Sequence, residues 1–366
     1  MTSTRWRLFK GAALLALPAL ALTACGGSAS TQPANGGDVS GELVFSIYPG
    51  VFQDNYVKSV VEPFEKLHPN LKISFVQART SAESLAALRA DKNNPSVDVS
   101  LLDLAVARTA NAEGIFQALD PAAVPNLKDL DPKARINGDF GAGVTFDSVA
   151  LMYNTKAVKS APESWNALWE DPAANGKTAI IGPPDLTSTV GLTVITTQME
   201  GGDYKKSVDQ GIAKLAKLSS RVETWNPQPD PYTMVQNGSA SYGVGWNARS
   251  QLFADQSNGA MKAVLPKEGT VLQVNTLNQV KGSPNPKAAA AFINYALGTE
   301  AQGSFAKLMA YAPTNTKVQL SADLLSKIPA ADPAKSSRVI PLDWDVVVKQ
   351  RDSWATRLKT EVVGAK

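Results

Sequence analysis

Short apolar runs alternate with helix-spaced apolar positions from residue 41 onward. Gly41–Tyr48 predicts a strand, and apolar residues then recur at helical spacing over residues 57–67 until His68. Leu71–Val76 and Val97–Leu102 predict the next two strands, and a helical pattern follows each of them. This strand–helix order indicates a parallel sheet wrapped by helices, which is an α/β fold.

The same alternation returns in the second half of the chain. Thr178–Ile181 predicts a strand and residues 208–218 a long helix. A third section begins at Val271, followed by an apolar helix over Ala288–Leu297 and a final amphipathic helix over Asp343–Thr360. The chain has 366 residues. Because a single hydrophobic core stops growing near ~250–300 residues, we expect more than one core.

The first 24 residues have the order of a secretory signal, with basic residues first, then an apolar stretch, then small residues. The apolar stretch, residues 11–22, is shorter than the ~20 residues that span a bilayer. Leu22–Cys25 resembles a bacterial lipobox, in which the cysteine is lipidated after cleavage. The alternatives are a plain signal peptide with an incidental cysteine, or an N-terminal membrane anchor. Residues 25–40 have the composition of a flexible tether. We therefore expect an extracytoplasmic protein held to the bacterial cell membrane by lipid on Cys25.

The positive net charge of the chain comes entirely from the basic residues of this leader. The whole chain carries 36 Lys plus Arg and 33 Asp plus Glu, which gives +3. Arg5, Arg7 and Lys10 are the only charged residues of the leader, so the mature chain has 36 − 3 = 33 bases against 33 acids. No later run of basic residues is present, and we expect no nucleic-acid partner.

The scarcity of histidine and cysteine excludes several kinds of chemistry. One cysteine excludes an internal disulfide, and one histidine excludes a His-clustered zinc site. His68 ends a predicted helix beside a proline, and Gly-x-Ser-x-Gly is absent. We therefore expect no metal, no cofactor and no enzymatic activity. The alternatives are a secreted lipoprotein hydrolase with paired carboxylates and a structural lipoprotein.

Several short segments form a recognisable series along the chain. They are Val97-Asp98-Val99 with Glu113-Gly114, Ser164–Pro172 with Gly176-Lys177, Asn237–Asn247, Pro266–Gly269, and Ala310–Pro313. In order and spacing these segments resemble extracellular solute-binding proteins of ABC importers, in the branch with spermidine/putrescine, thiamine, ferric-iron and phosphonate binders.

This resemblance implies an α/β, periplasmic-binding-protein-like fold of two lobes, with a ligand cleft and hinge crossings between them. Its implied division places 41–145 and 276–313 in lobe 1, and 146–275 and 314–366 in lobe 2. The implied partners are a small-molecule ligand and a membrane permease with its ATPase. We expect a monomer.

The resemblance also suggests where ligand binds. Its aromatic candidates are Tyr48, Trp225, Trp246 and Tyr311. Aromatic walls and carboxylates suit the methylene chain and ammonium ends of a polyamine. The alternatives are a buried strand tryptophan for Trp246, a packing residue at a turn for Tyr311, and a rigid loop for Trp225.

Some polar candidates differ from the polyamine-binding pattern. Gln273 and Asn275 stand where polyamine binders have a Trp and an Asp, which removes one ammonium anchor. Asp103 stands where they have a Ser, and it is either a relocated amine anchor or the N-cap of the next helix. Asn247, next to Trp246, completes this group.

Other candidates favour an anionic group on the ligand. The turn that contains Asp185, Ser188 and Thr189 follows a strand, and its hydroxyl and N–H groups either bind a carboxylate or phosphate or cap a helix. Arg249 either pairs with a ligand carboxylate or is a solvated helix residue. This mixture predicts a solute with one amine and one acid end, such as an amino-acid derivative.

Other ligand classes of the same fold stay open. A polyamine or related amine is one, and thiamine or a phosphonate or other organic anion is the alternative. Ferric iron is disfavoured because that branch characteristically uses adjacent tyrosines, and the eight tyrosines here are never adjacent.

Overall fold

The computed structural model describes residues 39–332 and 334–365. The predicted leader, Cys25 and the predicted tether up to residue 38 lie outside the described residues, so the lipid anchor stays a prediction. None of the described helices is long and apolar enough to cross a membrane.

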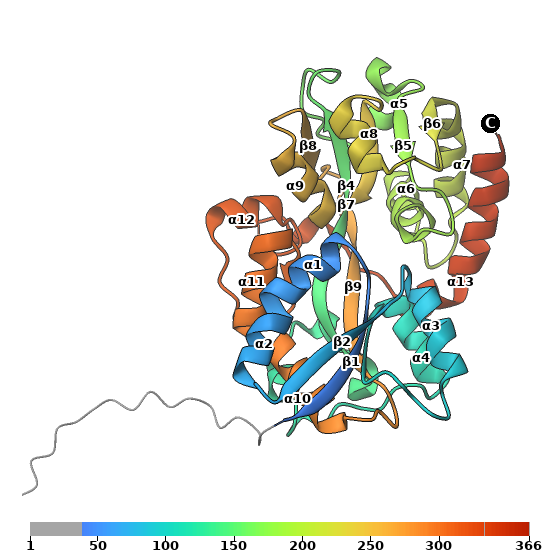
Figure 1. Cartoon of the computed structure of the whole chain (residues 1–366). Coiled ribbons are helices and arrows are strands. Elements are labelled where there is room, and N and C mark those ends of the chain that lie inside the picture. Colours follow the sequence, from blue (N-terminus) through green and yellow to red (C-terminus); the bar gives the residue numbers. More distant parts are fainter. Residues whose placement is uncertain (1–38, 333, 366) are drawn as a thin grey trace, which may run out of the picture. The chain divides into compact units, whose positions relative to one another are not determined.

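Helices and strands alternate along the described chain (Figure 1). The strands are β1 Gly41–Ile47, β2 Leu71–Gln77, β3 Val99–Asp103, β4 Ala142–Asn154, β5 Thr178–Ile180, β6 Val222–Thr224, β7 Tyr242–Trp246, β8 Met261–Val264, β9 Thr270–Gln279, β10 Ala312–Pro313 and β11 Val339–Ile340. The α-helices are α1 Val51–Tyr56, α2 Glu62–Leu67, α3 Ser81–Ala90, α4 Leu104–Ala112, α5 Ala167–Glu170, α6 Thr193–Met199, α7 Asp209–Leu218, α8 Pro231–Asn237, α9 Asn247–Gln256, α10 Pro286–Ala296, α11 Thr299–Met309, α12 Ala322–Lys327 and α13 Trp344–Arg357. Turns of π-helix, Val57–Val61, Thr187–Leu192 and Leu358–Val362, extend α1, α6 and α13.

One hydrogen-bonded path of strands runs through the molecule in the order β2-β1-β3-β9-β4-β7-β5-β6. The three N-terminal strands are parallel, as the sequence predicted. In the middle of the path, β9 pairs antiparallel with both β3 and β4. Residues 142–148 of β4 pair with β9, whereas 149–153 pair with β7. Figure 1 shows β9 and β4 running from the part that holds β1 to the part that holds β7. These two strands therefore connect the two halves.

Alternate residues of β1 face different helices, as the two-residue period of a strand requires. Leu43, Phe45 and Ile47 pack in one cluster with α1, α2, α10 and α11, whereas Val44 packs against a smaller cluster formed with α3 and α4. Figure 1 shows these two groups of helices on opposite sides of β1 and β2. The first part of the chain is thus a sheet covered on both faces.

Two large hydrophobic clusters divide the molecule at the crossing strands. Phe146 and Leu272 belong to the first cluster, and Val149 and Val271 belong to the second. After β10, Ile328 is buried in the first cluster and Val339 still packs against it, whereas Ile340 is buried in the second. We call the two halves lobe 1 and lobe 2; the residue-level boundaries given above stay a prediction.

Two of the segments that carry the family resemblance meet in lobe 2. The carboxylate of Glu268 accepts hydrogen bonds from the Ser164 hydroxyl and, at 3.1 Å, from the Trp165 backbone N–H. The indole N–H of Trp165 donates to the Gly269 carbonyl at 2.8 Å. Gly269 has a φ of +94°, and a Cβ there would lie 2.2 Å from the Arg338 carbonyl oxygen, so only glycine fits. These contacts therefore fix the segment that leads into β9, one of the two strands that connect the lobes.

Candidate functional site

The Ser81 hydroxyl connects two predicted site residues of lobe 1. It shares a 2.5 Å hydrogen bond with the Tyr48 hydroxyl and accepts one of 2.9 Å from the Asp103 backbone N–H. Burial raises the pKa of Tyr48 far above its usual value, and the Asp103 carboxylate raises it further. Tyr48 is therefore a neutral hydroxyl in the protein.

Asp103 is the N-cap of α4. Its Oδ1 accepts a 3.1 Å hydrogen bond from the Val106 N–H, and its side chain is buried at the carboxyl end of β3. This is one of the two roles that the sequence suggested for it. A carboxylate has about four acceptor positions, so the cap bond leaves capacity for a second role as an amine anchor. That second role stays a prediction.

Trp246 and Gln273 line the same small cavity as Asp103. Trp246 ends β7 opposite Val149 on β4, and Gln273 lies on β9 opposite Asp147. Trp246 is half-buried and packs against the second cluster. Three of the predicted residues therefore meet where the crossing strands pass between the lobes.

Arg249 is a cation next to several carboxylates and phenols. Its guanidinium carbon lies 5.5 Å from the centroid of the Tyr232 ring, and the Tyr232 hydroxyl accepts a 2.9 Å hydrogen bond from the Trp246 N–H. Its side chain is exposed, although Tyr311, Asp230 and Asp147 all act on its charge.

Asp185 of lobe 2 lies within reach of the charge of Asp103 of lobe 1. Oδ1 of Asp185 accepts a 2.8 Å hydrogen bond from the Thr187 N–H. Burial raises the pKa of Asp185 and the Asp103 carboxylate raises it further, whereas Thr187 and Arg249 oppose the rise. A cation close to both groups would oppose the effect of Asp103 and favour the ionised form of Asp185.

The sequence analysis missed Asp147, which is an acid inside a strand whose residues are all buried. Its Oδ1 accepts hydrogen bonds from the N–H groups of Ala248 at 3.0 Å and Ser148 at 2.8 Å, and its buried Oδ2 has no hydrogen-bond partner among the residues that the structure describes. Burial raises its pKa to about 7 against these hydrogen bonds and the charge of Arg249. The signal available in the sequence was a single acidic residue within an otherwise uncharged, largely apolar segment.

Replacing Asp147 by Asn should stabilise the protein more at pH 8 than at pH 5. Burial raises the pKa in the folded state from 3.8 to about 7, so the folded protein holds this proton more tightly than the unfolded chain. The free energy of unfolding therefore falls as the pH rises from about 4 to about 7, by on the order of a few kcal/mol at most. Urea unfolding at several pH values measures this.

A control variant separates Asp147 from the general effect of removing a charge. Asp352 has a side chain that is 94% exposed, so Asp352→Asn should change stability equally at pH 5 and pH 8. A gain for Asp147→Asn that does not vary with pH would show that Asp147 is ionised throughout.

The remaining predicted residues are engaged in packing. Ser188 donates to the Asp185 carbonyl at 3.2 Å, and Thr189 is buried with its hydroxyl unpartnered. The other four predicted residues contact neighbouring parts of the protein. Trp225 is buried in the second cluster, the Asn247 amide donates to the Lys327 carbonyl, the Asn275 amide donates to the Thr145 hydroxyl, and Tyr311 stacks on Phe305. Their ligand roles stay predictions.

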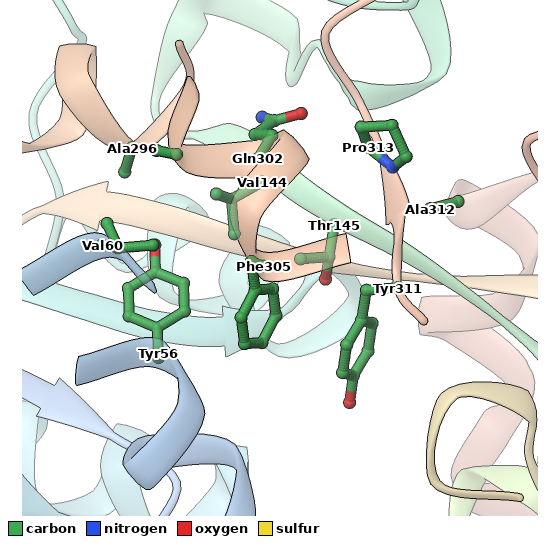
Figure 2. A pocket seen from close by; sticks show the side chains of 11 residues that line it. Tyr56, Val60, Val144, Thr145, Ala296, Gln302, Phe305, Tyr311, Ala312 and Pro313 are labelled. Carbon is green, nitrogen blue, oxygen red and sulfur yellow. The ribbon is translucent and has the colours of Figure 1, made fainter. Parts of the chain in front are cut away.

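A second cavity lies inside lobe 1, away from Asp103 and Trp246. Figure 2 shows Tyr56, Phe305, Thr145 and Tyr311 among the side chains that line it. Its volume is ≈ 10 Å³, which is room for about one water molecule. The buried Tyr56 hydroxyl has no partner among the described residues, so this space suits an internal water rather than a solute.

No group of three or more His, Cys, Asp or Glu side chains is arranged to hold a metal ion among residues 39–332 and 334–365.

Comparison with known proteins places the chain in a family. Residues 59–334 match the family of bacterial extracellular solute-binding proteins. The spermidine/putrescine-binding periplasmic protein 1 of Haemophilus influenzae is 28% identical over 229 residues, which are 61% of this chain and 61% of that protein. The gamma-aminobutyric acid-binding protein of Pseudomonas aeruginosa is 26% identical over 211 residues, which are 56% of this chain and 57% of that protein. The chain thus matches about three fifths of the length of these relatives.

Solved structures agree on the fold. A crystal structure described as an ABC transporter from Clostridium perfringens aligns with a TM-score of 0.70 at 26% identity, over 87% of this chain and 99% of that chain. The family resemblance and the periplasmic-binding-protein-like α/β fold expected from the sequence are confirmed.

Proposed function

We propose, since this chain belongs to the bacterial extracellular solute-binding protein family, that it captures a small amine-bearing solute for an ABC importer. The solute would bind between the lobes and pass to a membrane permease with its ATPase. The observation that carries the proposal is the placement of Asp103 beside Trp246 and Gln273 where the lobes meet, close enough to Asp185 of lobe 2 for its charge to raise the pKa of that carboxyl. An ammonium group between them would lower the cost of holding both ionised.

Arg249 supports a zwitterion with an amine and an acid end. It is the cation that acts on Asp185 and Asp147, and its planar guanidinium can bind a carboxylate bidentately. Relatives named for spermidine/putrescine and for gamma-aminobutyric acid fit an amine as the shared feature. The ligand class is therefore an amine, with an amino acid preferred over a polyamine.

Capture without chemistry also belongs to the proposal. Ligand would favour the closed arrangement of the lobes because it binds that arrangement more tightly, and the closed form would dock on the permease. We further propose a monomer, extracytoplasmic and anchored by lipid on Cys25, with no catalytic activity. Mass spectrometry of the mature N-terminus tests the anchor.

Thermal unfolding against a solute panel tests the proposal. The panel is putrescine, spermidine, γ-aminobutyrate, thiamine and a phosphonate without an amine. One amine-bearing solute should raise the melting temperature saturably, with a stabilisation of about 2.7 kcal/mol at 100 times its Kd. A shift with the phosphonate alone would favour the organic-anion alternative. Turnover of a panel member without any shift would favour the hydrolase.

A further inference from the structure

The junction of β7 and α9 carries two of the candidate site residues, Trp246 and Arg249. Two buried groups from other elements hold this junction, and the first is Tyr232 of α8. Its hydroxyl accepts a 2.9 Å hydrogen bond from the Trp246 N–H, and its ring centroid lies 5.5 Å from the guanidinium carbon of Arg249. A Cβ on Gly245 would lie 2.7 Å from this ring, so the tyrosine packs directly against the end of β7.

The second group is the carboxylate of Asp147, which reaches the junction from the crossing strand β4. Asp147 belongs to the part of β4 that pairs with β9, two residues before Val149 pairs with Trp246. Its Oδ1 accepts a 3.0 Å hydrogen bond from the N–H of Ala248, in the first turn of α9 and next to Arg249. The first N–H groups of a helix have no partner within the helix. Asp147 therefore fixes the start of α9 to a strand that connects the lobes.

The charge of Arg249 acts on this buried carboxylate. Oδ2 of Asp147 has no hydrogen-bond partner in the described part of the chain. Burial raises the pKa of Asp147, whereas Arg249 lowers it. The phenols of Tyr232 and Tyr311 also face Asp147, and because burial raises the pKa of both, they stay neutral near pH 7. Arg249 is therefore the charged neighbour that favours the ionised form of Asp147.

A solute carboxylate at Arg249 would change this balance. It would neutralise the positive charge that favours ionised Asp147, so the proton affinity of Asp147 would rise when the solute binds. In the opposite direction, an ionised Asp147 competes with the solute carboxylate for the charge of Arg249. Proton binding at Asp147 and solute binding therefore favour each other, as linkage requires.

We propose that Asp147 positions Arg249 for the acid end of the solute and couples solute binding to the uptake of a proton. The inference rests on the proposed function and deepens it, because only a solute with an acid end would show this coupling. Asp147 acts through the start of α9 and through the charge of Arg249, without touching the solute. The proton comes from the buffer and goes to Oδ2, the oxygen without a partner among the described residues.

Calorimetry with γ-aminobutyrate at pH 7, in two buffers of different ionisation enthalpy, measures the protons taken up. Both ends of this solute keep their charges between pH 6 and pH 8.5, so any uptake belongs to the protein. Asp147 has a pKa of about 7, and a ~10-fold gain in proton affinity on binding would give an uptake of ~0.4 proton per solute. Asp147→Asn keeps an oxygen for the Ala248 N–H and should lose this part of the uptake. Asp185 also responds to Arg249, so the quantity compared is the difference between wild type and variant.

The affinities should show the same coupling. The ratio of the wild-type affinity for γ-aminobutyrate to that of Asp147→Asn should fall by about 5- to 10-fold from pH 6 to pH 8.5. A residue that only maintained the fold would change the affinity by the same factor at every pH. Asp352→Asn, whose side chain is 94% exposed, is the matched control and should follow the wild-type profile.

A comparison of solutes needs no variant. Putrescine has no acid end and leaves the charge of Arg249 in place, so the wild-type protein should take up fewer protons with putrescine than with γ-aminobutyrate.

The outcomes distinguish this coupling from the function. If γ-aminobutyrate binds and the wild-type protein and Asp147→Asn take up equal numbers of protons, the coupling is wrong and the proposed function stands. The same conclusion follows if the wild-type protein takes up fewer protons than the variant, or if putrescine binds and γ-aminobutyrate does not. If no amine binds, the proposed function and this inference both fail.

Discussion

Replacing Trp246 by Ala should weaken binding of the amine-bearing solute by about 100-fold or more, the size of effect that a central aromatic anchor typically carries. Trp246 is half-buried, lines the cavity with Asp103, and ends the strand that pairs with the crossing strand β4. The substitution removes an aromatic surface for the cation and opens the cavity to water. Calorimetry with the solute that shifts the melting temperature measures the loss.

The melting temperature without ligand separates binding from folding. The backbone N–H of Trp246, which donates to Tyr232, is unaffected by the substitution, so the unliganded variant should stay folded. Trp246→Phe keeps an aromatic ring and should lose less than ~10-fold in affinity. A Trp246→Ala protein that unfolds near room temperature, or that binds the solute normally, would show Trp246 to be a packing residue.

Replacing Asp98 by Ala should lower the free energy of unfolding by about 3–5 kcal/mol, the cost of breaking a buried, fully hydrogen-bonded carboxylate. Asp98 is fully buried. Its Oδ2 accepts from the Val44 N–H at 2.8 Å, and its Oδ1 accepts from the Ser283 hydroxyl at 2.8 Å and the Asn285 N–H at 2.6 Å. Alanine would leave these three donors buried without an acceptor.

Urea unfolding at pH 7 measures this loss. Asp91→Ala is the control: Asp91 is exposed and accepts from the Ser96 hydroxyl, so its removal should cost less than about 1 kcal/mol. An Asp98→Ala midpoint close to that of Asp91→Ala would mean that water or a backbone shift satisfies the three donors.

The local parts of the fold were predictable because local sequence determines them. At the start of α3, Thr80 accepts from the Glu83 N–H and Glu83 accepts from the Arg79 N–H, which is close to the capping-box arrangement of Thr and Glu three residues apart. The strand at Leu71 is β2, and the helix expected around 208–218 is α7. Caps and periodicities of this kind involve residues that are close along the chain.

β4 was missed because its pattern carries no alternation. All residues of this strand are buried, so its apolar run does not show the two-residue period of a half-exposed strand. Asp147 lies within it, and its importance depends on Ala248 and Arg249, which are about 100 positions away in sequence. A buried acid can be noticed in a sequence, but its neighbours cannot.

Trp344, which lines the same cavity as Trp246, was missed for a related reason. The strand that delivers it, β11, has two residues, Val339 and Ile340, and pairs with residues 270–271. A strand that short has no periodicity to detect. In contrast, Asp103 and Trp246 were proposed as site residues because they stand at positions that the family resemblance implies for ligand contacts.

Isothermal titration calorimetry of the protein with γ-aminobutyrate, putrescine and spermidine, beside butyrate as the deaminated control, tests the central claim most directly. The account predicts that an amine-bearing solute binds saturably at one molecule per chain, while butyrate does not bind. Binding of butyrate as tight as that of γ-aminobutyrate, or no binding of any amine, would contradict it.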